Sequence, residues 1–302
     1  MRKLKILSLT LLLLLSAVLF LSVYLAEATL HPKRKVISNR SLQIAHEVSR
    51  KYGCGLNDVQ ITASEGVALK AWFFDCKSSR VVLLLHGQAD NRAGMMDYAQ
   101  LLLRNRYSAV LPDLRAHGLS GGAVATYGLK EADDVHRWVQ WLKKIRPDSS
   151  VYGLGESLGA AILLQSLKNE DGFRAVVAES SFSNFREIGY DRLGKFFGSG
   201  SISRGFMRPI VSLAFTYSYL RYGIDLESVS PESVVAATWI PILLIHGAND
   251  RSIPPRHSRR IASVAHQNVD LWVVANAGHT GVLGRRPVEF ADRVCNLFNS
   301  GN

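Results

Sequence analysis

Short runs of β-branched and aliphatic residues alternate with helical stretches along most of this 302-residue chain. Six runs predict buried strands at residues 81–85, 109–111, 150–152, 175–178, 242–245 and 271–274. The segments near 92–105, 129–145, 158–168, 256–266 and 287–298 predict helices. Strands that alternate with helices form a parallel sheet with helices on both faces. Loops that carry function then gather where the carboxyl ends of the strands meet.

Two further strands are expected before this alternation begins. Residues 59–62 and 67–74 alternate in hydrophobicity around Ser64-Glu65-Gly66, which is typical of a β-hairpin. The pattern therefore predicts an α/β fold with a mostly parallel central sheet of about eight strands. The interval between Ser183 and Trp239 contains no strand of this kind and is rich in aromatic residues. A structureless loop of that length is unusual in a compact domain, so we expect a helical cap at about 184–238.

The N-terminus carries an uncharged apolar run at residues 6–25. As a helix, which rises ~1.5 Å per residue, this run would span the ~30 Å core of a bilayer. It is longer than the ~7–15 residue apolar core of a cleaved signal peptide, which favours a retained signal anchor. Ala26-Glu27-Ala28 nevertheless fits the small-x-small cleavage pattern, so a secreted or periplasmic protein cleaved near Ala28 is the alternative.

The chain thus divides into three parts. Residues 1–28 are a signal anchor or signal peptide, 29–58 a linker with an N-terminal helix, and 59–302 the main domain with its cap. Lys and Arg flank the apolar run on both sides in nearly equal number, so the positive-inside rule does not orient it. We place the main domain outside the cytoplasm because a very short N-terminal tail usually stays inside.

The formal net charge of +11 raises the question of nucleic-acid binding. Residues 1–35 carry six of the 36 Lys and Arg residues but only one of the 25 Asp and Glu residues. The rest of the chain is therefore only moderately basic, and the excess flanks the apolar run. We expect a membrane partner through the N-terminal helix and no nucleic-acid partner.

The sequence Gly155-Glu156-Ser157-Leu158-Gly159 lies between an expected strand and an expected helix. In this context a Gly-x-Ser-x-Gly pattern forms a sharp, strained turn that exposes the serine hydroxyl, and the glycines prevent collisions on either side. A serine needs a base to become a good nucleophile, and the base needs a carboxylate to fix its tautomer. His279 follows the last strand and Asp250 the preceding one, so Ser157, Asp250 and His279 are the candidate catalytic residues. Glu179 is the rival acid.

An acyl-transfer site also needs donors for the oxyanion. The expected strand 81–85 ends in His86-Gly87-Gln88, and the backbone N–H of Gln88 is the candidate first donor. The N–H of Leu158, immediately after the serine, is the second. Asp113 also ends a strand, and we interpret it as an anchor for its own loop.

Five segments together resemble the α/β-hydrolase superfamily, in its serine aminopeptidase-like and monoglyceride-lipase-like branch. They are Leu-Leu-Leu-His-Gly (83–87), Pro-Asp-Leu-Arg-Ala-His-Gly-Leu-Ser (112–120), Gly-Glu-Ser-Leu-Gly (155–159), Ile-His-Gly-Ala-Asn-Asp (245–250) and Ala-Gly-His (277–279). The resemblance implies the α/β-hydrolase fold and a serine hydrolase that acts on a small-molecule or lipid acyl substrate. Carboxylic esters are the favoured substrate class. The alternatives on the same triad are hydrolysis of a thioester, of an amide or of a peptide, and acyl transfer. A further alternative is a non-catalytic, membrane-anchored binding protein.

We interpret the remaining histidines and cysteines as structural residues. His86, His117 and His246 each precede a glycine near a strand end and should pack the loops, whereas His257 and His266 should lie on a helix surface. The spacing of His, Cys, Asp and Glu fits no metal site, and no nucleotide-binding motif is present, so we expect neither metal nor cofactor. Cys54 and Cys76 flank the first hairpin and could pair in an oxidising compartment, or be small buried hydrophobes.

Overall fold

The computed structural model describes residues 2–300 apart from 171 and 199. Its centre is an eight-stranded sheet in the order β1-β2-β4-β3-β5-β6-β7-β8. The strands are β1 (Gly55–Thr62), β2 (Ala68–Asp75), β3 (Arg80–Leu85), β4 (Ser108–Pro112), β5 (Ser150–Glu156), β6 (Phe173–Glu179), β7 (Ile242–Gly247) and β8 (Val269–Val274). β2 is antiparallel to both neighbours, and the other pairs are parallel. The predicted mostly parallel sheet is confirmed.

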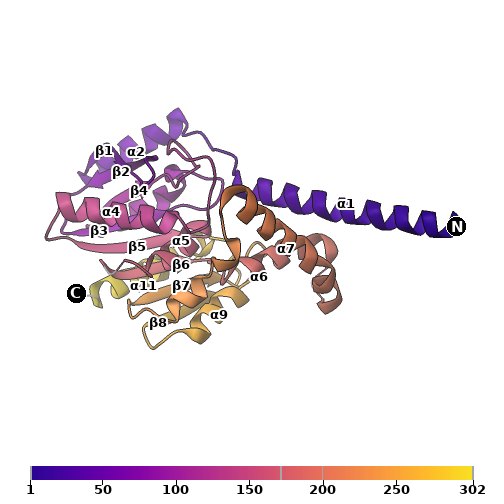
Figure 1. Cartoon of the computed structure of the whole chain (residues 1–302). Helices are drawn as coiled ribbons and strands as arrows, with labels where there is room; N and C mark the ends of the chain where they lie inside the picture. The colour runs from indigo at the N-terminus through magenta and orange to yellow at the C-terminus, as the bar shows by residue number, and fades with distance from the viewer. Residues whose placement is uncertain (1, 171, 199, 301–302) are drawn as a thin grey trace.

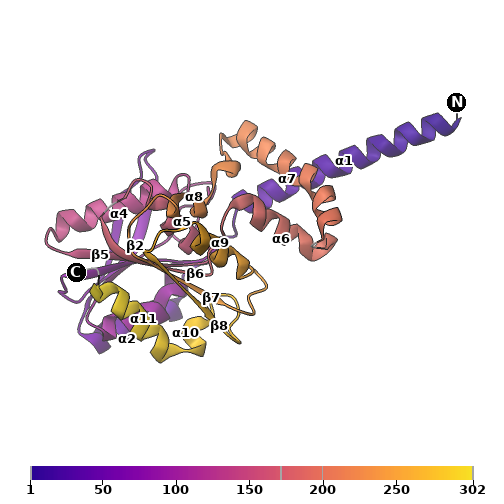
Figure 2. The ribbon, with the colours of Figure 1, turned by 90° about the horizontal axis from the view of Figure 1, so that it is seen from below.

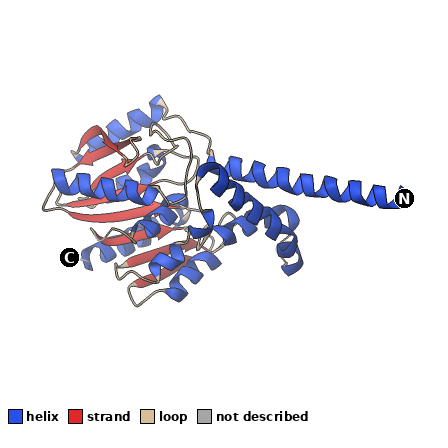
Figure 3. Cartoon of the chain, in the orientation of Figure 1, coloured by secondary structure: helices blue, strands red, loops and turns tan. Residues whose placement is uncertain are grey.

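Helices cover both faces of this sheet (Figure 3). One core contains residues of α4 (Glu131–Ile145), α5 (Leu158–Ser166), α8 (Pro231–Val235) and α9 (Arg256–Val264). The other contains residues of α2 (Asn39–Tyr52), α3 (Met96–Arg104), α10 (Val282–Arg285) and α11 (Pro287–Ser300). Leu83 on β3 faces the first core and Leu84 the second, as the alternation of side chains along a strand requires. Both faces of a parallel sheet are buried, which explains the continuous apolar runs of the sequence.

The interval 184–238 forms helices beside the ends of the strands. α6 (Phe185–Phe197) and α7 (Ser201–Tyr222) make a hairpin that projects away from the sheet, next to α1 (Arg2–Leu30), as Figures 1 and 2 show. We call α6 and α7 the cap hairpin. α8 returns the chain to the sheet, where it packs against α5 and α9.

The N-terminal helix α1 extends beyond the apolar run that the sequence showed. By length and composition it is the one helix among the described residues able to cross a membrane, with a mean hydropathy of 2.7 in its most apolar window. Most of it is exposed and projects from the molecule (Figure 1). Its C-terminal turns differ: Ser22, Ala26 and Leu30 are buried, and Leu30 belongs to the core of the domain.

The segment between α1 and β1 is tied to the domain at two places. The Arg34 guanidinium donates hydrogen bonds to the carbonyls of Ser120, 2.5 Å away, and Gly122, 2.8 Å away. Cys54 and Cys76 form a disulfide across the β1–β2 hairpin, which resolves the two readings of these cysteines. β1 begins at Gly55, four residues earlier than the hydrophobic alternation indicated, because its first residues are mostly exposed.

Candidate active site

Ser157 lies in the turn between β5 and α5. Its φ of 52° and ψ of −114° are a strained combination for a residue with a side chain. The two flanking glycines make the turn possible. A Cβ on Gly155 would lie 2.5 Å from the Gly159 carbonyl oxygen, and a Cβ on Gly159 would lie 2.1 Å from the Leu85 oxygen. The steric reason for the Gly-x-Ser-x-Gly pattern is therefore visible in the backbone contacts.

The structure brings Ser157, His279 and Asp250 together from three different loops. His279 Nε2 lies 2.9 Å from Ser157 Oγ, and His279 Nδ1 lies 2.7 Å from Asp250 Oδ2. Asp250 follows β7, and His279 follows β8, the neighbouring strand. The Asp250 side chain is fully buried, whereas His279 retains 29% of its side-chain exposure, so a substrate can reach the imidazole.

The Asp250 carboxylate determines which nitrogen of His279 carries the proton. Burial alone would raise the pKa of Asp250, but hydrogen bonds from His246, His279 and the N–H of Ile253 lower it well below its ordinary value. An ionised carboxylate only accepts hydrogen bonds, so Nδ1 of His279 must be the donor. Nε2 is then free to accept from the Ser157 hydroxyl. This arrangement can remove the proton from Ser157.

The loop after β3 lies beside Ser157. A Cβ on Gly87 would be 3.5 Å from the Ser157 Cβ, which places the backbone of the next residue, Gln88, at the edge of the site. Leu158 is the first residue of α5, and the first N–H groups of a helix have no acceptor within it. The Gln88 side chain holds its loop: Nε2 donates to Tyr127 Oη at 2.7 Å, and Oε1 accepts from Arg192 at 2.9 Å.

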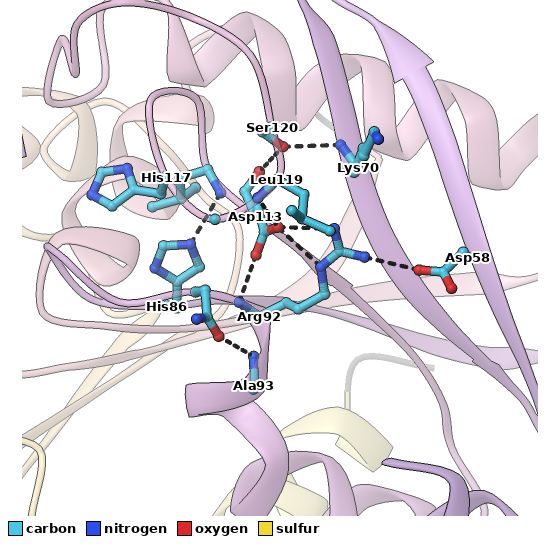
Figure 4. A network of polar contacts seen from close by, with 12 residues as sticks. Asp58, Lys70, His86, Arg92, Ala93, Asp113, His117, Leu119 and Ser120 are labelled. Carbon is cyan, nitrogen blue, oxygen red and sulfur yellow. Dashed lines mark hydrogen bonds and ion pairs between the residues drawn. The ribbon is translucent and has the colours of Figure 1, made fainter. Parts of the chain in front are cut away.

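A buried network anchors the β3 and β4 loops from the opposite side (Figure 4). Asp113 accepts from the Arg92 N–H at 2.7 Å, from the Arg92 guanidinium at 2.8 Å and from the Leu119 N–H at 2.7 Å. His86 Nε2 accepts from the Leu114 N–H at 3.0 Å, so its proton is on Nδ1, which donates to the Gly87 oxygen. Burial lowers the pKa of His86 to about 4, and the imidazole is neutral. These residues shape the loop rather than react.

Glu179, the rival acid, points elsewhere. Its Oε1 accepts from the Val282 N–H at 3.0 Å and its Oε2 from the Tyr98 hydroxyl at 2.9 Å. The same hydroxyl lies 3.2 Å from Glu156 Oε2. Burial raises the pKa of Glu179, and burial together with the Glu179 charge raises that of Glu156 to about 7. Sequence reasoning missed this carboxylate pair behind Ser157, although Glu156 in the turn was a signal for it.

The prediction that His257 lies on a helix surface is wrong. The residue is fully buried: its Nδ1 accepts from the Ser183 N–H at 3.1 Å, and its Nε2 lies 2.8 Å from Asp191 Oδ2. α9 turns this face toward the start of the cap, which its sequence alone does not reveal. His246 is also buried and contacts the Ser258 hydroxyl at 2.6 Å. Among the described residues, no group of three or more His, Cys, Asp or Glu side chains could hold a metal ion.

Comparison with known proteins places this site in a family. The model of the alpha/beta hydrolase family matches residues 82–293. The chain belongs to the α/β-hydrolase family. An esterase of Pyrococcus furiosus, Pf2001, superimposes with a TM-score of 0.71 at 25% identity, over 90% of this chain and 98% of that one. The family and this likeness identify the protein as a hydrolase.

Two sequence relatives resemble the chain over different extents. YqkD of Bacillus subtilis (strain 168) is 26% identical over 280 residues, which cover 88% of both proteins. The lysophosphatidylserine lipase ABHD12 of Macaca fascicularis is 27% identical over 206 residues, which cover 64% of this chain and 48% of that protein. The likeness to YqkD therefore extends beyond the family match.

Proposed function

We propose that the protein is a serine hydrolase that cleaves carboxylic esters, with Ser157 as nucleophile, His279 as base and Asp250 as orienting acid. The observation that carries this proposal is the unbroken hydrogen-bonded series from Asp250 through His279 to Ser157, which lies at a strained turn. Nucleophile, base and orienting group in hydrogen-bond reach are the signature of acyl transfer through a covalent intermediate.

The reaction follows from the roles of these atoms. Ser157 Oγ attacks the ester carbonyl while its proton passes to His279 Nε2, and the N–H groups of Gln88 and Leu158 hold the oxyanion. The carbon–oxygen bond to the alcohol then breaks, and His279 returns the proton to the leaving alkoxide. Water attacks the acyl-enzyme, again giving its proton to His279. The acid leaves as Ser157 recovers its proton.

A lipid or other long acyl ester is the substrate class that we favour. The relatives supply part of the support, since one is described as an esterase and another as a lysophosphatidylserine lipase. The helix α1 supplies the rest, because an anchor holds the hydrolase at a lipid surface.

We propose that α1 is retained as a single membrane anchor and that the hydrolase lies outside the cytoplasm. The burial of Ser22 and Ala26 supports retention, because cleavage near Ala28 would remove residues that pack against the cap hairpin. The Cys54–Cys76 disulfide supports the orientation, because disulfides persist in oxidising compartments.

Labelling with a fluorophosphonate tests the proposal. Wild-type protein should be labelled and Ser157→Ala should not, while Ser183→Ala, a matched change at a buried serine, should keep the label. A panel of p-nitrophenyl ester, thioester and anilide of one acyl group should show fastest turnover for the ester. A folded wild type that neither takes the label nor turns over any substrate would establish the non-catalytic alternative.

A further inference from the structure

A cavity of about 130 Å³ lies between the anchor helix and the cap hairpin. Its walls come from both: Leu25, Ala26 and Thr29 of α1 face Phe196 of α6 and Val211 and Phe215 of α7. The lining is apolar except for Thr29 and Arg192. A cavity of about 150 Å³ is large enough to hold benzene. It therefore offers room for about six carbon atoms of an apolar ligand.

The two polar lining residues connect the cavity to the candidate active site. Arg192 donates to the Gln88 side chain at 2.9 Å, and the Thr29 carbonyl accepts from the Tyr127 hydroxyl at 2.8 Å. Tyr127 in turn accepts from Gln88 at 2.7 Å. Gln88 follows Gly87, which lies against Ser157. The side chain of Gln88 thus lies between this end of the cavity and the loop beside Ser157.

The other end of the cavity opens at the surface beside the anchor, since Phe196 lines it and is 84% exposed. α7 crosses α1 obliquely and diverges from it toward the turn between α6 and α7, as Figures 1 and 2 show. Near the end of α7, the hydroxyls of Tyr217 and Tyr222 donate to Glu27, whereas earlier residues of α7 pack with Val18 of α1. The cap hairpin therefore contacts the last part of the apolar run of α1, while its tip projects away from α1, as Figure 2 shows.

The tip of the cap hairpin, around the turn between α6 and α7, exposes apolar side chains. Ile202 is 80% and Phe206 75% exposed, and Phe197 also faces solvent. Exposed apolar side chains clustered on one surface mark an interaction site. This tip projects from the same side of the molecule as α1, a helix with the length and composition of a membrane span (Figures 1 and 2). The bilayer is therefore the partner that fits both the tip and the helix.

We propose that this cavity is the acyl-chain site of the enzyme and that the anchor helix is one of its walls. The acyl chain of a membrane lipid enters laterally from the bilayer, between α1 and the cap hairpin, and its ester reaches Ser157. The ester and the carbons next to it lie on the Ser157 side of Gln88, carbons farther along the chain fill the cavity, and the end of a long chain runs out past Phe196 into the bilayer. Hydrolysis of the ester at Ser157 rests on the proposed function, whereas binding of the acyl chain in the cavity does not.

The decisive experiment places the same substitution on two faces of α1 in the full chain, reconstituted in phosphatidylcholine nanodiscs. Ala26 is 2% exposed and lines the cavity, whereas Ala28 is exposed. Ala26→Leu should lower kcat/KM for the p-nitrophenyl dodecanoate at least tenfold relative to the acetate, which is too short to use the cavity. Ala28→Leu should leave that ratio unchanged. Equal ratios in wild type and Ala26→Leu would overturn the proposal.

A binding measurement covers the case in which Ala26→Leu does not fold or the protein proves inactive. A lysophosphatidylcholine with a diazirine in its acyl chain is photolysed with Ser157→Ala in the same nanodiscs, and cross-linked peptides are mapped. Cross-links to Phe185 or Leu193, cavity residues that are buried from the bilayer, support the proposal. Cross-links confined to the exposed side chains of α1 would refute it. Cross-links at the cavity, combined with a folded wild type that hydrolyses no ester, would refute the proposed function and leave the binding site supported.

Discussion

Replacing Asp250 by asparagine should abolish most activity while leaving the fold and the binding of substrate in place. The N–H groups of Ser252 and Ile253 donate to Asp250 Oδ1 at 2.8 and 2.9 Å. In Asp250→Asn these donors keep the amide oxygen at that place, so the amide NH₂ must face His279 Nδ1. Two donors cannot face each other, and the imidazole must shift its proton to Nε2. That nitrogen then cannot accept the Ser157 proton.

The expected size of the effect follows from the loss of the base. The corresponding change in a serine protease triad lowers kcat by about 10⁴, which is about 5 kcal/mol of barrier. We expect a similar fall in kcat for a p-nitrophenyl ester, a KM within a few fold of wild type, and equally slow fluorophosphonate labelling. Thermal unfolding should show that Asp250→Asn is folded.

The matched control is Glu179→Gln, a change of the same kind at the acid after the preceding strand. Glu179 contacts Tyr98 and the Val282 N–H, not His279. The glutamine oxygen can still accept from the Val282 N–H, and its NH₂ can donate to the Tyr98 oxygen. The kcat of Glu179→Gln should stay within about one order of magnitude of wild type. A kcat of Asp250→Asn above a tenth of wild type, or an equal loss in Glu179→Gln, would refute the assignment of the orienting acid.

Three further predictions test the surroundings of the site. Glu156 has a pKa of about 7 in the folded protein against 4.5 as an isolated group, so ionisation of this carboxyl opposes folding. The melting temperature should therefore fall as the pH rises from about 4.5 to 7, and it should fall less in Glu156→Gln. Gly159→Ala should yield no labelled enzyme, because the added methyl group meets the Leu85 oxygen at 2.1 Å; wild-type labelling would contradict the steric argument. Reduction of the disulfide between Cys54 and Cys76, 22 residues apart, should lower the free energy of unfolding by about 3 kcal/mol in urea titrations, and an unchanged midpoint would show that it constrains little.

The pattern of strands and helices could be read from the sequence because it depends on local chemistry. Parallel strands buried on both faces require continuous apolar runs, and the helices that cover them require amphipathic periodicity. The turn at Ser157 could also be predicted from the sequence. Its glycines are required by close backbone contacts, some within a few residues and some with the adjacent strand. Ser157, Asp250 and His279 could be selected as candidates because each lies in a loop that follows an expected strand.

Other features depended on which residues meet across the fold. Glu179 ends β6 and Asp250 follows β7, at the same edge of the sheet, and only the directions of their side chains decide that Asp250 contacts His279. His257 lies in an amphipathic helix, and the sequence pattern of this helix does not indicate its partner Asp191, 66 residues away. A buried charge is tolerated where packing supplies such a partner, and sequence patterns do not encode that pairing.

The sequence by itself determined that the chain is an α/β hydrolase with a strained serine turn and an apolar N-terminal helix, because each feature rests on local spacing and sterics. Only the tertiary structure decided that the last turns of α1 pack against the cap hairpin and close a cavity with it. Contacts such as Glu27 with Tyr217 join residues 190 apart, and their formation depends on the packing of two whole helices. The hydrophobic pattern of an apolar helix is the same whether its end lies in lipid or forms the wall of a binding site.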